Sequence, residues 1–74
     1  MDDVTRDQIR TAFAELTSLM EDAASRAVEG QSPEINAAEA MQLTRSIVTL
    51  LGGASSCLRS IEALAAGQSP EGRP

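Results

Sequence analysis

Apolar residues recur at alternating spacings of three and four along most of the chain, which is the pattern of an amphipathic helix. In the first half the recurring positions are Ile9, Phe13, Leu16, Met20, Ala23 and Ala27, with Ala12 and Leu19 widening the stripe on one side. This spacing predicts a first helix over about residues 5–29.

The beginning of this helix carries a capping signal. Thr5 precedes Gln8 by three residues, as in a capping box in which each side chain bonds the other residue's backbone amide. Val4 and Ile9 stand where a hydrophobic staple would place them. We therefore expect the helix to begin near Thr5.

A short turn is expected after the first helix. Gly30 is suited to end the helix in a left-handed conformation, Ser32 to cap a second helix, and Pro33 to occupy its first turn. The stop and the start lie about three residues apart, and a connection this short returns the chain antiparallel to the first helix. The sequence thus predicts a helical hairpin.

The second helix is predicted over about residues 34–66. Its apolar seam consists of Ala40, Leu43, Ile47, Leu50, Ala54, Cys57, Ile61 and Leu64. Leu51 and Leu58 flank this seam on one side, and Met41 and Val48 extend it further around the helix. One antiparallel partner does not cover a stripe this wide, so a second partner surface is expected.

Gly52 and Gly53 lie in the middle of the predicted second helix, where glycine is unfavourable. Two glycines inside a helix cost about 2 kcal/mol relative to alanine, and Ser55 could cap a new helix after them. Both glycines lie off the seam, however, and the seam passes them without losing register. We expect one helix, weakened or bent at this point; the alternative is a break that gives three helices.

Folding the hairpin about residues 30–32 fixes which residues should face one another. The expected pairs are Ala27 with Ile35, Ala23 with Ala40, Met20 with Leu43, Leu16 with Ile47, Phe13 with Leu50 and Ile9 with Ala54. In this register Ile61 and Leu64 have no partner in their own chain. Either the segment 55–66 folds back, or another chain covers it.

The whole chain is short for an independent fold. We expect one all-α domain over residues 1–66 and a disordered tail over residues 67–74, where Gly and Pro are frequent and large apolar residues are absent. A core built from so few residues supplies only a few kcal/mol. The hairpin is therefore expected to associate into a four-helix bundle; a monomeric three-helix bundle is the alternative.

The net charge of the chain limits the kinds of partner that we expect. The net charge is −5, from eleven acidic residues against six Arg, with no Lys. A surface of this sign repels phosphate backbones, so nucleic-acid binding is the least favoured function. The acidic residues after Met1 and the lack of a run of 18 apolar residues lead us to expect a cytoplasmic protein that does not engage a membrane.

Few residues are suited to chemistry. The chain has no His, and its one cysteine, Cys57, lies on the apolar seam, where a buried structural role is expected. The neighbouring Glu21 and Asp22 point in different directions on a helix, as solvated residues do. We expect no enzyme activity, no metal site and no cofactor.

These expectations converge on an interaction module. The predicted contact residues are Met41, Val48, Leu51, Leu58, Ile61 and Leu64. The predicted partner is a protein: a second copy of the chain, most simply in a dimer, or a helix of a different protein. An accessory subunit of a larger enzyme or complex is the alternative.

Overall fold

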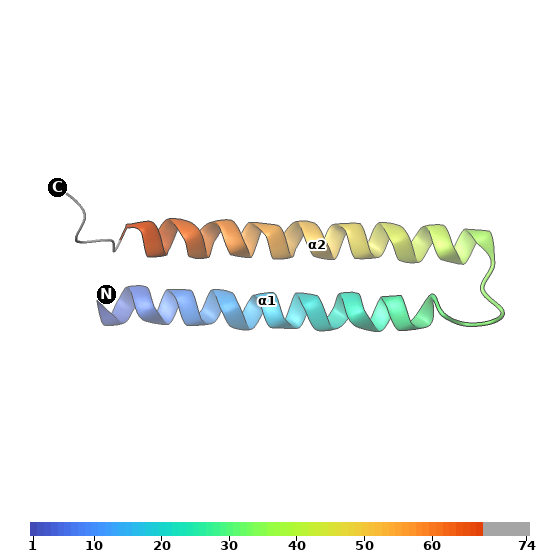
Figure 1. Cartoon of the computed structure of the whole chain (residues 1–74), viewed down its shortest axis with the longest axis horizontal. Coiled ribbons are helices and arrows are strands. Elements are labelled where there is room, and N and C mark those ends of the chain that lie inside the picture. Colours follow the sequence, from blue (N-terminus) through green and yellow to red (C-terminus); the bar gives the residue numbers. More distant parts are fainter. Residues whose placement is uncertain (68–74) are drawn as a thin grey trace.

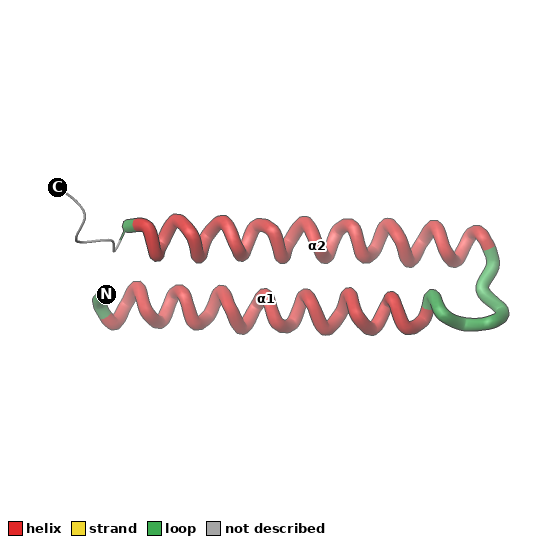
Figure 2. The backbone as a smooth tube through the Cα atoms, in the orientation of Figure 1, coloured by secondary structure: helices red, strands yellow, loops and turns green. Residues whose placement is uncertain are grey.

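The computed structural model describes residues 1–67, and within that range the chain is a helical hairpin without strands. Helix α1 spans Asp3–Glu29 and helix α2 spans Ala37–Ala66. The two helices lie antiparallel and side by side, and the first turns of α2 extend past the end of α1 at the connecting loop (Figures 1 and 2). The predicted all-α hairpin is thus confirmed, whereas nearly all of the predicted tail lies outside the described residues.

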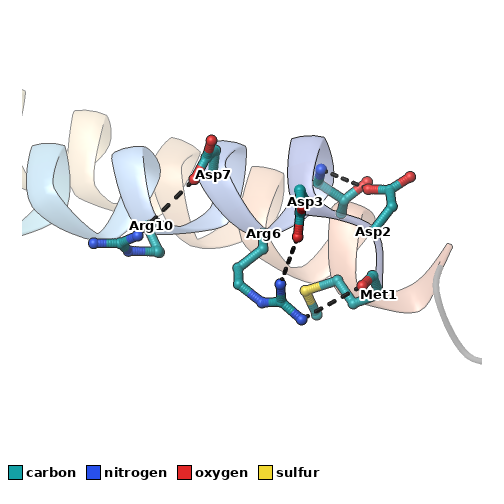
Figure 3. Close-up of polar contacts among 7 residues, drawn as sticks. Met1, Asp2, Asp3, Arg6, Asp7 and Arg10 are labelled. Atoms are coloured by element: carbon teal, nitrogen blue, oxygen red, sulfur yellow. Dashed lines mark hydrogen bonds and ion pairs between the residues drawn. The ribbon is translucent and has the colours of Figure 1, made fainter.

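Helix α1 begins two residues before the predicted start. Its N-cap is Asp2, whose Oδ1 accepts a hydrogen bond of 2.7 Å from the backbone amide of Thr5 (Figure 3). A carboxylate at this position also interacts favourably with the positive end of the helix dipole. The prediction of Thr5 as the cap was wrong because Thr5 lies in the first turn, where it is buried between the helices.

The turn after α1 is longer than predicted. Gly30 caps α1 in the right-handed region, at φ −68° and ψ −10°, so the expected left-handed cap is wrong. Ser32 and Pro33 do not open α2 but form a reverse turn, in which the Ile35 amide donates to the Ser32 carbonyl over 3.2 Å. Pro at the second position of such a turn has its φ already set.

Helix α2 begins after this turn, at a capping box that the sequence analysis did not use. The Asn36 side chain accepts a 2.8 Å bond from the Glu39 amide, and the Glu39 carboxylate accepts one of 3.3 Å from the Asn36 amide. These reciprocal bonds place the first residue of α2 at Ala37 rather than at residue 34.

Helix α2 runs unbroken through Gly52 and Gly53. The expectation of one continuous helix is confirmed, and the three-helix alternative is wrong for the described chain. A Cβ added at Gly53 would lie 3.3 Å from Cδ1 of Leu19, whereas one at Gly52 would meet no atom within 4 Å. Gly53 is therefore a point of close approach between the helices.

The longer turn also changes the register between the helices. Leu19 lies against Gly53, and the Arg26 Nε donates a 3.0 Å hydrogen bond to the Ser46 hydroxyl. The predicted register placed Met20 beside Leu43 and is wrong. Because the connection extends over residues 30–36 and the first turns of α2 extend past the end of α1, each residue of α1 faces one about nine positions further along α2 than expected.

The contact between the helices is narrow. Among the described residues only Thr5, Ala54 and Cys57 are buried. The half-buried positions around them continue the seam; on α1 they are Ile9, Ala12, Leu16, Leu19 and Ala23, and on α2 Leu43, Ser46, Ile47, Leu50, Gly53, Ile61 and Leu64. A single layer of two helices has no third element to cover its flat sides.

Two residues predicted to belong to the α1 seam lie outside the contact between the helices. Phe13 and Met20 are about half exposed, and Ala12 and Leu19, the residues just before them, take the inner positions. Ala27 and Ala40 are exposed as well, contrary to the prediction for the layers nearest the turn. Small residues on the inner row let the backbones approach closely.

Ile61 and Leu64 do have a partner in their own chain. Both are half-buried, and Leu64 lines a shallow groove together with Val4 and Ala12 of α1. The prediction that they extend past the end of α1 was wrong, because the shifted register brings the last turns of α2 beside the first turns of α1.

Candidate interaction face

One flat side of the hairpin carries most of its exposed large apolar side chains, and we call it the apolar face. On α1 these are Phe13 and Met20, which are 49% and 52% exposed. On α2 they are Met41, Val48, Leu51 and Leu58, exposed by 53%, 63%, 48% and 51%.

Helix geometry places these residues on a common side. Phe13 and Met20 each follow an inner residue of α1 by one position, and Leu51 and Leu58 each follow an inner residue of α2 by one position. One residue is a rotation of about 100°. Because both helices are right-handed and run in opposite directions, equal rotations from the seam lead to the same flat side of the pair.

The shallow grooves on the molecule confirm which residues form the opposite side. Two of these grooves are lined in part by residues that precede a seam position, such as Gln8 and Glu15 of α1 and Ser46 and Ser60 of α2. This side carries carboxylates and hydroxyls where the apolar face carries hydrocarbon. This side therefore carries more polar side chains than the apolar face, and aliphatic residues such as Val4, Ala63 and Leu64 line part of its groove.

The register brings the apolar residues of the two helices to the same levels. Given the contact of Leu19 with Gly53, Met20 lies level with Leu51, and two turns away Phe13 lies level with Leu58. The four side chains form a continuous strip along the middle of the face. Met41 and Val48 extend the strip on α2 toward the turn.

The structure divides the six predicted contact residues into two groups. Met41, Val48, Leu51 and Leu58 are exposed on the apolar face, and Ile61 and Leu64 are half-buried within the hairpin. Phe13 and Met20 were not among the predicted contact residues, because the heptad spacing placed them inside the core. Their one-residue offset from Ala12 and Leu19 was visible in the sequence, but only the register shows which row faces inward.

Charged residues border the apolar face near the chain termini. Arg10 lies 3.9 Å from Asp7, and Arg6 lies 3.0 Å from Asp3, in pairs that are largely exposed (Figure 3). Pairs of this kind contribute little to stability and leave the guanidinium groups available to other partners. At the N-cap, hydrogen bonding from Thr5 lowers the pKa of Asp2 below its usual 3.8.

The described residues offer little to catalysis or metal binding. Cys57 is a free thiol buried between the helices, as its seam position predicted. Residues 1–67 bring together no group of three Cys, Asp or Glu side chains that could hold a metal ion. The shallow grooves are open and are lined by carboxylate, amide, hydroxyl and aliphatic side chains.

Helix α2 is also long and apolar enough, by length and composition, to cross a membrane. Few of its residues are buried within the hairpin, so packing inside this molecule does not by itself account for that composition.

Comparison of the chain with models of known families, with curated proteins and with solved structures finds no match.

Proposed function

We propose that this protein is a non-enzymatic, helical protein–protein interaction module. Its apolar face packs against two helices of a partner and completes a four-helix bundle. The partner is a second copy of the chain or a helical segment of another protein, and we expect the encounter to take place in the cytoplasm.

The observation that carries this proposal is the half-exposed strip of Phe13, Met20, Leu51 and Leu58. Fully burying one such side chain stabilises a protein by about 1.5–3 kcal/mol relative to leaving it exposed. Leaving the strip exposed therefore costs the hairpin several kcal/mol of folding free energy, and the fully buried residues of its core are all small. A four-helix bundle recovers this free energy without changing either helix.

The size of the face also fits a specific interface. A helix of 30 residues is about 45 Å long, and two helices side by side are about 20 Å wide. The face thus offers on the order of 900 Å², close to the roughly 800 Å² per partner in stable complexes.

A lipid phase is the less favoured cover for α2. Helix α1 packs along most of α2, and its exposed surface carries carboxylates such as Glu15, Glu21 and Asp22 at mid-length. Moving α2 into a bilayer would either separate the helices or carry these charges with it, at a cost of several kcal/mol. A partner helix imposes neither penalty.

The proposal is tested by the molar mass in solution, measured by light scattering across a dilution series. We expect the wild-type chain to associate at micromolar concentration or to copurify with one defined protein in a fixed ratio. Leu51→Asp and Leu58→Asp should each weaken this association at least about tenfold, since each places a charge in a desolvated contact.

Ser56→Asp is the matched control, because Ser56 lies between the two leucines in sequence and on the other side of α2. It introduces the same charge and should leave the association unchanged. Equal behaviour of all three variants, or recovery of the wild type from lipid vesicles rather than from a protein complex, would contradict the proposal. An accessory subunit of a larger enzyme would appear as a fixed heteromeric complex.

A further inference from the structure

The apolar face has a row of polar and apolar residues along each outer edge, and the two rows match. At the three levels that both helices share, read from the chain termini toward the turn, the α1 row is Arg10, Thr17 and Ala24 and the α2 row is Glu62, Ser55 and Val48. Asp3 and Met41 continue the two rows beyond these levels. Members of each row are seven residues apart, so they share a helix face.

The register places the rows level with each other. The contacts of Leu19 with Gly53 and of Arg26 with Ser46 fix which residues lie at the same height in the hairpin. At those heights Arg10 lies level with Glu62, and Thr17 with Ser55; Ala24 and Val48 form the third level. Within one hairpin these pairs stand on opposite edges of the face and are too far apart to meet.

We propose that the partner of the apolar face is a second copy of this chain, packed with its turn at the same end, so that α1 of each copy lies on α2 of the other. The proposal rests on the proposed function and specifies its partner and geometry. In this arrangement the two outer rows meet across the interface. A cation then faces a carboxylate, a hydroxyl faces a hydroxyl, and an aliphatic side chain faces another.

The inner strip fits the same arrangement. Phe13 of one copy meets Leu58 of the other, and Met20 meets Leu51. The strips of the two copies, which are related by a twofold axis, therefore bury each other. Each ion pair between Arg10 and Glu62 occurs twice in the dimer. The interface is thus matched in charge at the edge near the termini and in hydrophobicity at the centre.

The opposite orientation, with the two turns at opposite ends, gives poorer matches. Helix α1 would then lie on α1 and α2 on α2. Centring the strip near Thr17 and Ser55 would place Arg10 against Ala24 and Glu62 against Val48. Charges that are partly desolvated against apolar side chains weaken an interface. Charge complementarity therefore favours the orientation with both turns at one end.

The first test is a charge swap read out by light scattering. Arg10→Glu and Glu62→Arg each place like charges opposite one another twice in the dimer, and each should weaken self-association by about tenfold or more. Mixing the two single variants should produce a heterodimer in preference to either homodimer. Glu15→Arg, on the polar side of the hairpin, is the matched control and should leave self-association unchanged.

The second test reads the orientation directly. In a Cys57→Ala background, Thr17→Cys protein and Ser55→Cys protein are mixed and mildly oxidised, with helix content checked by circular dichroism. A disulfide between the two different variants is expected, because the Thr17 and Ser55 positions of opposite copies face each other.

The outcomes separate this inference from the proposed function. Dimers in which each variant crosslinks only to itself, or in which no crosslink forms, would overturn the orientation and leave self-association standing. A wild-type chain that is monomeric alone but binds another protein would overturn the choice of a second copy and keep the interaction module. A chain that associates with no protein would overturn both.

Discussion

Gly52 and Gly53 are neighbours in the chain but have different surroundings. Gly52 faces outward with no atom near its missing Cβ, while Gly53 faces Leu19 across the helix pair. Both reduce helix stability through the conformational freedom of the unfolded chain. Only at Gly53 does the absence of a side chain allow α1 and α2 to approach each other closely.

Substituting the two glycines should therefore change the stability of the hairpin by different amounts. Gly52→Ala is expected to raise the free energy of unfolding by about 1 kcal/mol, because it adds helix propensity and meets nothing. Gly53→Ala should gain less, or lose stability, because its Cβ would lie 3.3 Å from Leu19 Cδ1 and displace that side chain. Urea unfolding of both variants measures the difference; an equal gain at both positions would contradict the close contact.

The ionisation of Asp2 makes the stability of the fold depend on pH. Hydrogen bonding from Thr5, by its side chain and its amide, lowers the pKa of Asp2 below 3.8. A carboxyl with a lowered pKa in the folded state stabilises the fold above pH 3.8, and this contribution is lost as the pH falls through the lowered value.

We accordingly expect Asp2→Ala to be less stable than the wild type at neutral pH, and the difference to shrink on acidification below pH 3.8. Thermal unfolding at a series of pH values measures this difference. A carboxyl titration of Asp2 by NMR with a midpoint at or above 3.8 would contradict the assignment of the cap.

At the scale of the elements, the start of α2 depends on a local competition between two possible caps. Ser32 and Asn36 are both good N-cap residues, and Pro33 after Ser32 made the first of them the natural prediction. Asn36 prevails because Glu39 completes a reciprocal pair of hydrogen bonds with it, while Ser32 is used in the turn. This outcome adds residues to the connection and sets the register of the whole hairpin.

The two caps give a matched pair of substitutions. Asn36→Ala should cost about 1 kcal/mol of stability, the usual effect of removing an N-cap side chain. Ser32→Ala removes only one exposed hydrogen bond, of 3.2 Å to the Glu34 amide, and should cost less. Urea denaturation compares them, and a larger loss at Ser32 would place the start of α2 there.

At the scale of the whole molecule, the hairpin is one layer thick, and its inner seam leaves a second apolar surface on one flat side. The seam uses small residues such as Ala54 and Cys57, which allow close packing but bury little area. The proposed complex would cover the apolar face, so the proposal links stability to association.

This linkage predicts a melting temperature that depends on protein concentration. Raising the concentration about a hundredfold should raise the melting temperature of the wild type by several degrees, since dimerisation draws chains into the folded state by mass action. Leu51→Asp should remove most of this dependence. Calorimetry or circular dichroism at several concentrations provides the measurement, and a wild-type melting temperature independent of concentration would contradict a self-associating fold.

The sequence by itself determined the elements. Seam spacing predicted two antiparallel helices, the end of α1 at residue 29 and the end of α2 at residue 66, and it predicted that α2 continues through Gly52 and Gly53. These features are local, because periodicity and helix-stop residues act within a few turns.

Only the tertiary structure decided which of the neighbouring apolar rows faces inward. Ala12 and Phe13 are adjacent, as are Leu19 and Met20, and a stripe this wide is compatible with either row as the core. The choice depends on the length of the turn and on the close approach of Leu19 to Gly53, which no local pattern encodes. That register leaves Phe13 and Met20 beside Leu58 and Leu51 on one exposed face.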